Sequence, residues 1–269
     1  MTNDTITKTK KMLLFFLQEL TMISKAKAKY IKSLQLKKYR KQEQSFVVEG
    51  EKGVTELLAS DFTATMVCAT KQFLEHHGNK IRGATEVVEV SPADLESIGS
   101  VETNDSVLAV ARMKANSRPV IRSNEYALVL DDIRDPGNLG TIIRTADWYG
   151  IRNIIASEET ADFYNPKVIR STMGSFCRVN VFYTGLKEFL GEVKMPVYGT
   201  FLNGEDVHLT QFSPGFVVIG NESNGISREI ESVITKRITI PRFGNAESLN
   251  ASIATAIILD NLKRTPRYH

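Results

Sequence analysis

The chain has 269 residues, of which 42% are hydrophobic and 24% are charged, and its formal net charge is +3. This composition is typical of a globular protein of about two domains, and it excludes disordered, collagen-like and disulfide-scaffold proteins. The two cysteines, Cys68 and Cys177, are far apart and lack a CxxC pattern, so the sequence predicts neither a metal site nor a disulfide framework. We expect a reducing, cytoplasmic environment.

The first 21 residues are expected to form a loosely attached extension without chemistry. Their longest apolar run, Met12 to Leu17, is too short to span a membrane, and no cleavage pattern of a signal peptide follows it. We therefore expect neither membrane insertion nor export.

Positive charge is concentrated near the start of the chain. Residues 8–41 contain eleven Lys or Arg and one acid, which leaves +10 there and, because the whole chain carries +3, −7 elsewhere. Tyr30, Ile31 and Leu34 form a short apolar stripe among these cations, a pattern typical of a helix that packs on a core and exposes its lysines. A solvated lysine-rich face and a polyanion-binding surface explain this pattern equally well. The second interpretation predicts RNA contacts at Lys25, Lys27, Lys29 and Lys32.

Beyond the basic segment, apolar bursts alternate with helical patterns, which predicts an α/β fold of two domains. Residues 22–117 have the pattern of a small α/β domain, and the polar stretch from Lys114 to Asn124 is the best linker candidate. In residues 118–269, strand-like and helical segments alternate, which predicts a parallel sheet covered by helices on both faces. The expected strands lie at residues 126–131, 153–157, 179–183, 197–201, 215–220 and 237–240.

Ligands of open α/β sheets bind beyond the carboxyl ends of strands, and three loops at such ends hold unusual polar residues. In the first loop, Pro136 and Gly137 predict a turn, and Asn138 is expected to cap the following helix. Arg144 lies on that otherwise apolar helix, where a guanidinium needs an anionic partner or a route to solvent.

In the second loop, Gly220 and Gly225 allow backbone amides to approach a ligand, and Glu222 between them is costly unless it is paired. Ile226 occupies the position of a P-loop lysine, and Ser223 does not fit the spacing of a serine-hydrolase elbow. Nucleotide hydrolysis and serine hydrolysis are therefore disfavoured.

The third loop follows Pro241 and includes Gly244. Ser248 or Asn250 is expected to cap the long apolar helix after it. Helix capping accounts for either Ser248 or Asn250. It does not account for the presence of three polar residues, Glu247, Ser248 and Asn250, within four positions.

Together the three loops resemble the signature motifs of the SpoU (TrmH) family of RNA 2′-O-ribose methyltransferases, in the SPOUT superfamily. The motifs occur in order as Asn138, Gly140 and Arg144; Gly220, Glu222 and Gly225; and Ile240, Pro241, Gly244, Ser248, Leu249, Asn250 and Ser252. Arg242 and Ala251 replace the family's usual methionine and valine. Residues 165–179 also resemble the family, and the basic start with FVVEGEKGV resembles its ribosomal-protein-L30e-like RNA-recognition domain. The likeness covers roughly residues 22–265.

The resemblance implies a homodimeric enzyme that uses S-adenosyl-L-methionine, methylates RNA and has a C-terminal trefoil knot in its methyltransferase domain. Ribosomal RNA, 23S rRNA in particular, is favoured over tRNA because the L30e-like domain resembles that of the ribosomal enzymes. The cofactor-binding residues implied are Gly220, Ile240, Leu249 and Asn250. The catalytic residues implied are Asn138, Arg144, Glu222, Ser248 and Asn250.

The role that we expect for Arg144 depends on how the proton of the ribose hydroxyl is removed. A guanidinium is a poor base, so we expect Arg144 to clamp a neighbouring phosphate and orient the 2′-hydroxyl, while Glu222 and Asn138 hold the arginine and the loops in place. Methyl transfer from a sulfonium needs no metal.

Two other classes of function are weighed against this one. An RNA-binding protein that keeps the fold without turnover is the main alternative, and the intact motif residues count against it. A nicotinamide-dependent oxidoreductase would need a GxGxxG motif after a strand, which the sequence lacks.

Four residues outside the motifs are given structural or neutral interpretations. His76 and His77 are expected to be exposed, Trp148 to pack in a core or a dimer contact, and Cys177 to be an ordinary buried side chain.

Overall fold

The computed structural model describes residues 23–78, 81–100 and 104–264, and the chain divides into two compact units between Met113 and Lys114. The expected extension, residues 1–21, lies outside the described residues. The unit boundary falls at the start of the predicted linker, so residues 114–117 belong to the second unit and not to the first. Among the residues described, no helix is long and apolar enough to span a bilayer.

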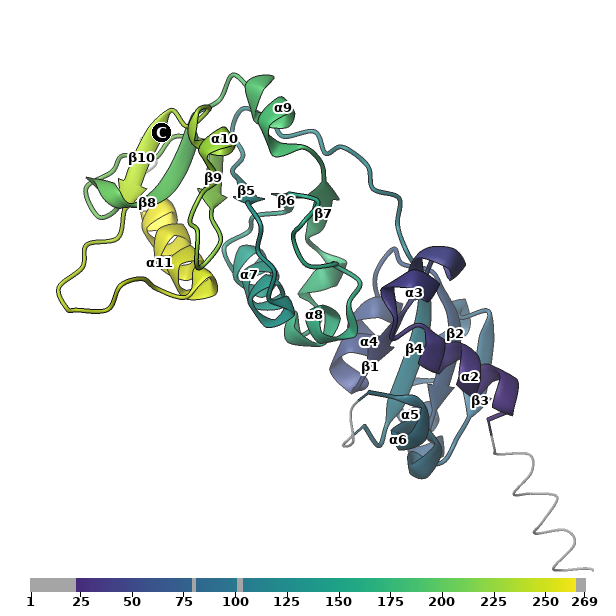
Figure 1. Cartoon of the computed structure of the whole chain (residues 1–269). Helices are drawn as coiled ribbons and strands as arrows, with labels where there is room; N and C mark the ends of the chain where they lie inside the picture. Colours follow the sequence, from purple (N-terminus) through teal and green to yellow (C-terminus); the bar gives the residue numbers. More distant parts are fainter. Residues whose placement is uncertain (1–22, 79–80, 101–103, 265–269) are drawn as a thin grey trace, which may run out of the picture. The chain divides into compact units, whose positions relative to one another are not determined.

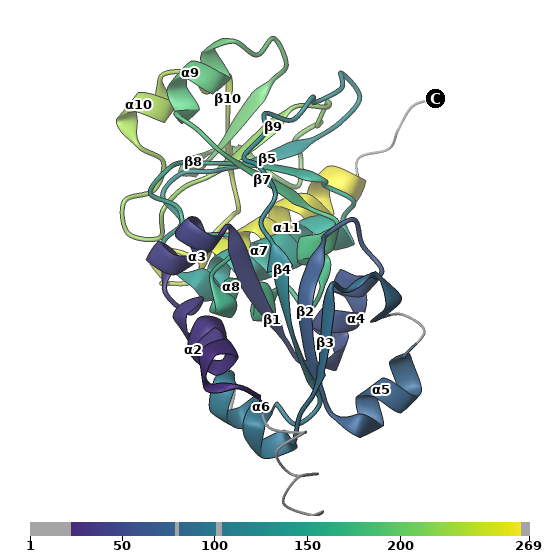
Figure 2. The same ribbon diagram turned by 90° about the vertical axis from the view of Figure 1, so that its right-hand side faces the viewer.

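The first unit is built on a mixed four-stranded sheet. Its strands are β1 (Ser45–Glu49), β2 (Ala64–Ala69), β3 (Glu86–Glu89) and β4 (Val107–Arg112), in the order β1-β4-β2-β3. Strand β4 runs antiparallel to both neighbours, and β2 and β3 are parallel. Figure 2 shows helices on both faces. Helices α4 (Glu51–Leu58) and α5 (Lys71–His77) cover one face, and α2 (Lys25–Ser33), α3 (Lys37–Glu43) and α6 (Pro92–Ile98) cover the other.

The basic segment packs on this sheet through its apolar stripe, as predicted. Ile31 and Leu34 are fully buried against Cys68 and Leu108 of the strands and Leu95 of α6. The removal of these side chains from water stabilises the helix on the core, because each buried aliphatic side chain contributes about 1.5–3 kcal/mol. Burial also raises the pKa of the Cys68 thiol to about 12.

The expectation of one continuous basic helix is wrong, because the chain turns between Ser33 and Lys37. The cause is Arg40, whose side chain is only 2% exposed. Its Nη1 donates hydrogen bonds to the carbonyl oxygens of Leu34 (2.9 Å) and Gln35 (2.8 Å), which the turn leaves without helical partners. One of the cations counted in the basic segment is therefore structural.

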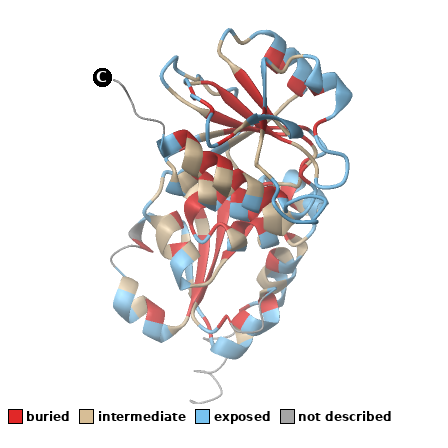
Figure 3. Ribbon diagram, turned by 90° about the vertical axis from the view of Figure 1, so that its left-hand side faces the viewer, coloured by how far each residue is buried: buried red, intermediate tan, exposed pale blue. Residues whose placement is uncertain are grey.

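The second unit contains a six-stranded sheet in which all strands are parallel, as predicted. Its strands are β5 (Ala127–Leu130), β6 (Asn153–Ala156), β7 (Asn180–Tyr183), β8 (Val197–Asp206), β9 (Phe216–Ile219) and β10 (Lys236–Thr239), in the order β10-β8-β9-β5-β6-β7. Strands β5, β6 and β9 are apolar at almost every position because both faces are covered, and Figure 3 shows their burial.

Helices cover both faces of this sheet (Figures 1 and 2). On one face lie α7 (Pro136–Trp148), α8 (Pro166–Ser171) and α11 (Ala251–Arg264), and on the other lie α9 (Leu186–Gly191) and α10 (Arg228–Glu231). Gly140 allows α7 to approach α8 closely. A Cβ atom there would lie 2.5 Å from Ser171 Cβ and 2.8 Å from the Val168 carbonyl oxygen.

The predicted linker is attached to the second unit along the edge strand β7. The Asn116 side chain pairs with the backbone of Tyr183, donating to its carbonyl oxygen and accepting from its N–H, both at 2.9 Å. The Lys114 N–H donates to the Tyr164 hydroxyl (2.8 Å), and Arg118 pairs with Glu192 (2.7 Å). The side chain of Asn116 thus satisfies a backbone pair at a sheet edge.

Candidate active site

The three motif loops follow the parallel strands β5, β9 and β10. They therefore all lie beyond the carboxyl ends of the strands, on the same side of the sheet. Their side chains meet in a hydrogen-bonded chain. Asn138 Nδ2 donates to Glu222 Oε1, and Asn250 Nδ2 donates to Asn138 Oδ1 (2.9 Å) and also lies 3.4 Å from Glu222 Oε1. We call Asn138, Glu222 and Asn250 the amide–carboxylate cluster. It brings together one predicted residue from each loop.

Asn250 also begins the last helix, which confirms one of the two predicted caps. Its Oδ1 accepts hydrogen bonds from the backbone N–H of Ser252 (3.0 Å) and the Ser252 hydroxyl (2.6 Å), so its Nδ2 is directed at the cluster. Ser248 does not cap the helix. The cap therefore fixes the orientation of the Asn250 amide, and this orientation determines which atom faces Asn138.

The predicted cap at Asn138 is wrong, because Asp135 is the cap of α7. Asp135 Oδ1 accepts from the Asn138 N–H at 2.8 Å, and Pro136 occupies the first helical position. This hydrogen bond, with the nearby Lys167, lowers the pKa of Asp135. Asn138 is the third residue of the helix, and its side chain is hydrogen-bonded to Glu222 instead of capping the helix.

The second loop is closed by hydrogen bonds within its own backbone. Asn221 and Gly225 form a reciprocal pair of backbone hydrogen bonds (3.0 and 2.8 Å), and Gly225 has a φ of +68° that favours glycine. A Cβ at Gly220 would lie 2.6 Å from the Gly225 carbonyl oxygen. Gly220 is expected from the sequence to allow the close approach of a ligand, whereas the nearest atoms to a Cβ there belong to the loop itself.

Several residues that the sequence analysis did not single out tie the first and second loops together. Asn221 Nδ2 donates to the Asp132 carbonyl oxygen at 2.8 Å, and buried Asp131 accepts from the Ser227 N–H at 2.7 Å. Asp132 has a φ of +61°. The paired aspartates at the end of a buried strand, and an asparagine between Gly220 and Glu222, are the signals that could have indicated them.

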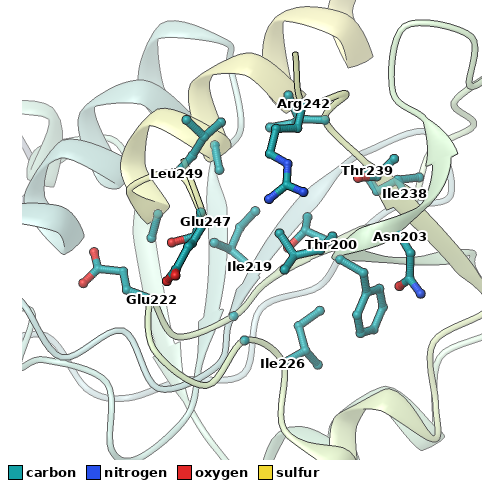
Figure 4. A pocket seen from close by; sticks show the side chains of 18 of the residues that line it. Thr200, Asn203, Ile219, Glu222, Ile226, Ile238, Thr239, Arg242, Glu247 and Leu249 are labelled. Atoms are coloured by element: carbon teal, nitrogen blue, oxygen red, sulfur yellow. The ribbon is translucent and has the colours of Figure 1, made fainter. Parts of the chain in front are cut away.

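A pocket of about 1000 Å³ opens between the second and third loops and the middle of β8 (Figure 4). Its apolar lining includes Ile219, Ile226 and Ile238. Glu222 lines it too, so the amide–carboxylate cluster and the pocket share this residue. Of the predicted cofactor and catalytic residues, Gly220, Ile240, Leu249 and Ser248 also line the pocket, whereas Asn250, Asn138 and Arg144 do not.

One wall of the pocket is formed by an irregularity in β8. The pairing of β8 with β10 passes from Gly199 to Glu205 between two successive residues of β10, so residues 200–204 bulge out of the ladder. Arg237 supports the bulge. Its guanidinium lies 3.7 Å from the centroid of the Phe201 ring, donates to Asn203 Oδ1 (3.0 Å) and pairs with Glu231.

Arg144 is exposed on α7 and has no hydrogen-bond or ion-pair partner among the described residues. The expectation that Glu222 and Asn138 hold it is therefore wrong for this structure, since those two side chains bind each other and Asn250. Of the two environments expected for this guanidinium, an anionic partner or solvent, the structure shows solvent. Trp148, four residues further on α7, is 84% exposed, so a position in the core is excluded and a dimer contact stays a prediction.

The predicted RNA-binding lysines are not equivalent. Lys25, Lys29 and Lys32 are exposed and lack an ion-pair partner in the part of the chain that is described, whereas Lys27 is half-buried and pairs with Glu86 of β3. His76 is exposed as expected, but His77 lies against Phe73 and 3.1 Å from Glu51.

Metal-binding chemistry has no candidate within the described residues, where no group of three or more His, Cys, Asp or Glu is suitably placed. Cys177 is half-buried rather than buried.

Comparison with known proteins gives two family matches. Residues 125–260 match the SpoU rRNA Methylase family, and residues 25–109 match the MRM3-like substrate binding domain. The chain is 31% identical over 242 residues to the 23S rRNA (guanosine(2553)-2′-O)-methyltransferase RlmP of Bacillus subtilis, covering 88% of this chain and 96% of that protein.

Solved structures that align with most of this chain are also similar. A TrmH-family protein from Porphyromonas gingivalis has a TM-score of 0.79 and 36% identity, over 90% of this chain and 98% of that one. An AdoMet-bound rRNA methyltransferase from Sinorhizobium meliloti has a TM-score of 0.81 and 29% identity, over 91% of this chain and 96% of that one.

Proposed function

The chain belongs to the SpoU rRNA methylase family, and we propose that it transfers a methyl group from S-adenosyl-L-methionine to a ribose 2′-hydroxyl of 23S rRNA. The observation that carries this proposal is the position of Glu222, which belongs both to the amide–carboxylate cluster and to the lining of the pocket. The pocket on one side of the cluster can hold the cofactor, and the other side of the cluster can receive the RNA.

The pocket fits the cofactor. Its volume of about 1000 Å³ is at the upper end of the usual range for small-molecule sites. Isoleucine side chains offer an apolar surface to a flat base, and side chains of both charge signs suit a zwitterionic amino-acid group. Gly220, Ile240 and Leu249 are the residues expected to make backbone contacts. The cofactor supplies an electrophilic methyl group on its sulfonium, so no metal is required to activate it.

The residues of the chain then align the nucleophile. Asn138, Glu222 and Asn250 hold the three loops in one geometry before substrate arrives, which lowers the cost of reorganisation during the reaction. Arg144 is exposed and unpaired in the described structure, so its planar guanidinium is free to bind a phosphate of RNA and orient the adjacent 2′-hydroxyl. We assign proton removal to that phosphate or to water, because arginine is a poor base.

RNA affinity is assigned to the first unit. Lys25, Lys29 and Lys32 can neutralise phosphates without reading bases. The match of residues 25–109 to a substrate-binding domain supports this division of labour.

The assembly and topology are further parts of the proposal. Exposed Trp148 of α7 and Ile253 of α11 (84% and 52% exposed) offer apolar surface for a homodimer. The trefoil knot implied by the family would involve the third loop between β10 and α11. A ribosomal RNA substrate implies that the protein acts in the cytoplasm.

Mass spectrometry of nucleosides tests the reaction. The protein is incubated with labelled cofactor and ribosomal RNA from a strain that lacks it, and the methyl group is located after digestion. We expect a single 2′-O-methylated nucleotide in 23S rRNA, and no transfer to the same RNA carrying a 2′-deoxy target. A methylated base, or RNA binding without any transfer, would contradict the proposal.

A further inference from the structure

Two opposite charges in the pocket have no ion-pair partner among the residues that the structure describes. Arg242 and Glu247 both line the pocket, and neither forms an ion pair with any residue that the structure describes. The other lining carboxylates differ from them. Glu222 accepts a hydrogen bond from Asn138, and Glu231 forms an ion pair with Arg237. Arg242 and Glu247 are thus the charged groups of the pocket that remain available to a ligand.

The side chain of Arg242 is directed at the interior of the pocket (Figure 4). Its Nη1 lies 3.4 Å from the Ala246 carbonyl oxygen, a long hydrogen bond that closes the turn between these residues. This contact uses one of the five guanidinium donors, and it places the arginine and Glu247 on the same wall. Glu247 also points into the pocket in this view.

The chemistry of these groups suits the amino-acid end of the cofactor, an inference that depends on the proposed function. That end carries a carboxylate and an ammonium on the same carbon. A guanidinium binds a carboxylate through two parallel hydrogen bonds, and a carboxylate binds an ammonium through charge-assisted ones. We propose that Arg242 binds the carboxylate and Glu247 the ammonium of S-adenosylmethionine, so that the two residues select the intact amino acid.

A phosphate of the RNA is the competing partner for Arg242. The pocket lining favours the cofactor, because Arg242 shares the cavity with the apolar side chains of Ile219 and Ile238. Both arginines are exposed, but Arg144 lies on α7 and is not part of the pocket lining. The two arginines therefore have different ligands, and Arg242 affects cofactor affinity rather than RNA affinity.

Calorimetry with two ligands and two proteins tests the assignment without RNA or turnover. The ligands are S-adenosylmethionine and decarboxylated S-adenosylmethionine, which keeps the ammonium and the sulfonium. The wild-type protein should bind the intact cofactor at least about tenfold more tightly, since a hydrogen-bonded charge pair contributes about 1.5–3 kcal/mol. Arg242→Met should lose most of this preference while binding the decarboxylated ligand almost normally.

Glu247→Gln provides the second arm. It should weaken binding of both ligands, because both keep the ammonium, but it should leave binding of 5′-methylthioadenosine unchanged, because that molecule lacks the amino-acid chain. Arg228→Met, an exposed arginine of α10 outside the pocket, is the matched control and should bind every ligand as the wild type does.

The outcomes separate the inference from the proposed function. If the wild-type protein binds no S-adenosylmethionine, the proposed function fails. If it binds the cofactor but Arg242→Met keeps the full preference for the carboxylate, the assignment of Arg242 is overturned while the function stands. A variant that loses RNA affinity and retains this preference assigns Arg242 to a phosphate and also overturns the inference.

Discussion

The amide–carboxylate cluster and the exposed cations differ in whether their polar side chains already have hydrogen-bond partners within the protein. Asn138, Glu222 and Asn250 bind one another before any substrate is present. Arg144 and Lys29 are exposed and have no partner among the residues described. A side chain that is already bonded has a fixed position, whereas an unpaired cation exchanges water for a phosphate when RNA arrives.

This difference indicates how each group acts. Changes in the cluster should affect the shape of the site and the stability of the fold together. Changes in the exposed cations should affect function while leaving the free energy of unfolding unaltered, because surface charges away from packed groups contribute little to it.

The largest expected effect is on turnover, after replacement of Arg144. Arg144→Lys keeps the charge but loses the planar pair of donors, so we expect the single-turnover rate of methyl transfer to fall by at least about 100-fold. Cofactor affinity and melting temperature should stay at the wild-type values, since the side chain is exposed and outside the pocket. A destabilised Arg144→Lys protein would place Arg144 with the bonded residues instead.

The next effect is on cofactor binding, after substitution of Gly220. Gly220→Ala should move the loop, because the new Cβ would lie 2.6 Å from the Gly225 carbonyl oxygen. We expect cofactor affinity to fall by at least about tenfold. The free energy of unfolding should fall by about 1–3 kcal/mol, the usual cost of overpacking. Gly191→Ala is the control, because a Cβ there meets nothing within 4 Å. Equal behaviour of the two variants would refute the tight closure of the loop.

A smaller effect is expected from the helix cap. Asn250→Ala removes both the cap of α11 and the donor to Asn138, and it should reduce the free energy of unfolding by about 1 kcal/mol. Asn250→Asp keeps a capping oxygen but replaces that donor with a second carboxylate near Glu222. It should therefore keep most of the stability and lose activity, measured by urea unfolding and methyl transfer on the same samples.

The sequence predicted the parts of the fold that depend on local patterns. The alternation of strand-like and helical segments predicted a parallel sheet, and the apolar runs at β5, β6 and β9 agree with it because strands buried on both faces are apolar throughout. The position of the three loops after predicted strands, together with the resemblance to the SpoU family, indicated that Asn138, Glu222 and Asn250 lie near one another. It could not indicate the bonds among them, because these depend on how three loops fold in space.

The missed features depend on how individual side chains are placed, which the residue type alone does not indicate. The turn in the basic segment is stabilised by buried Arg40, and an arginine among lysines resembles one more exposed cation. Asp135 was overlooked as a cap because Asn138 has equal capping propensity, and only the position of Pro136 at the first helical residue decides between them. Trp148 was expected to be covered, yet it is exposed in the single chain.

The smallest effect concerns the lysines of α2, and it sharpens the comparison within one helix. Lys29 is exposed, whereas Lys27 is already paired with Glu86. If RNA phosphates bind this surface, Lys29→Ala should reduce the slope of log affinity against log salt by at most about one. Lys27→Ala should change the slope less, because binding RNA there requires the loss of an existing ion pair. Filter binding over a range of salt concentrations measures both slopes. Equal reductions would show that the Lys27–Glu86 pair opens on RNA binding, and two unchanged slopes would remove α2 from the RNA-binding surface.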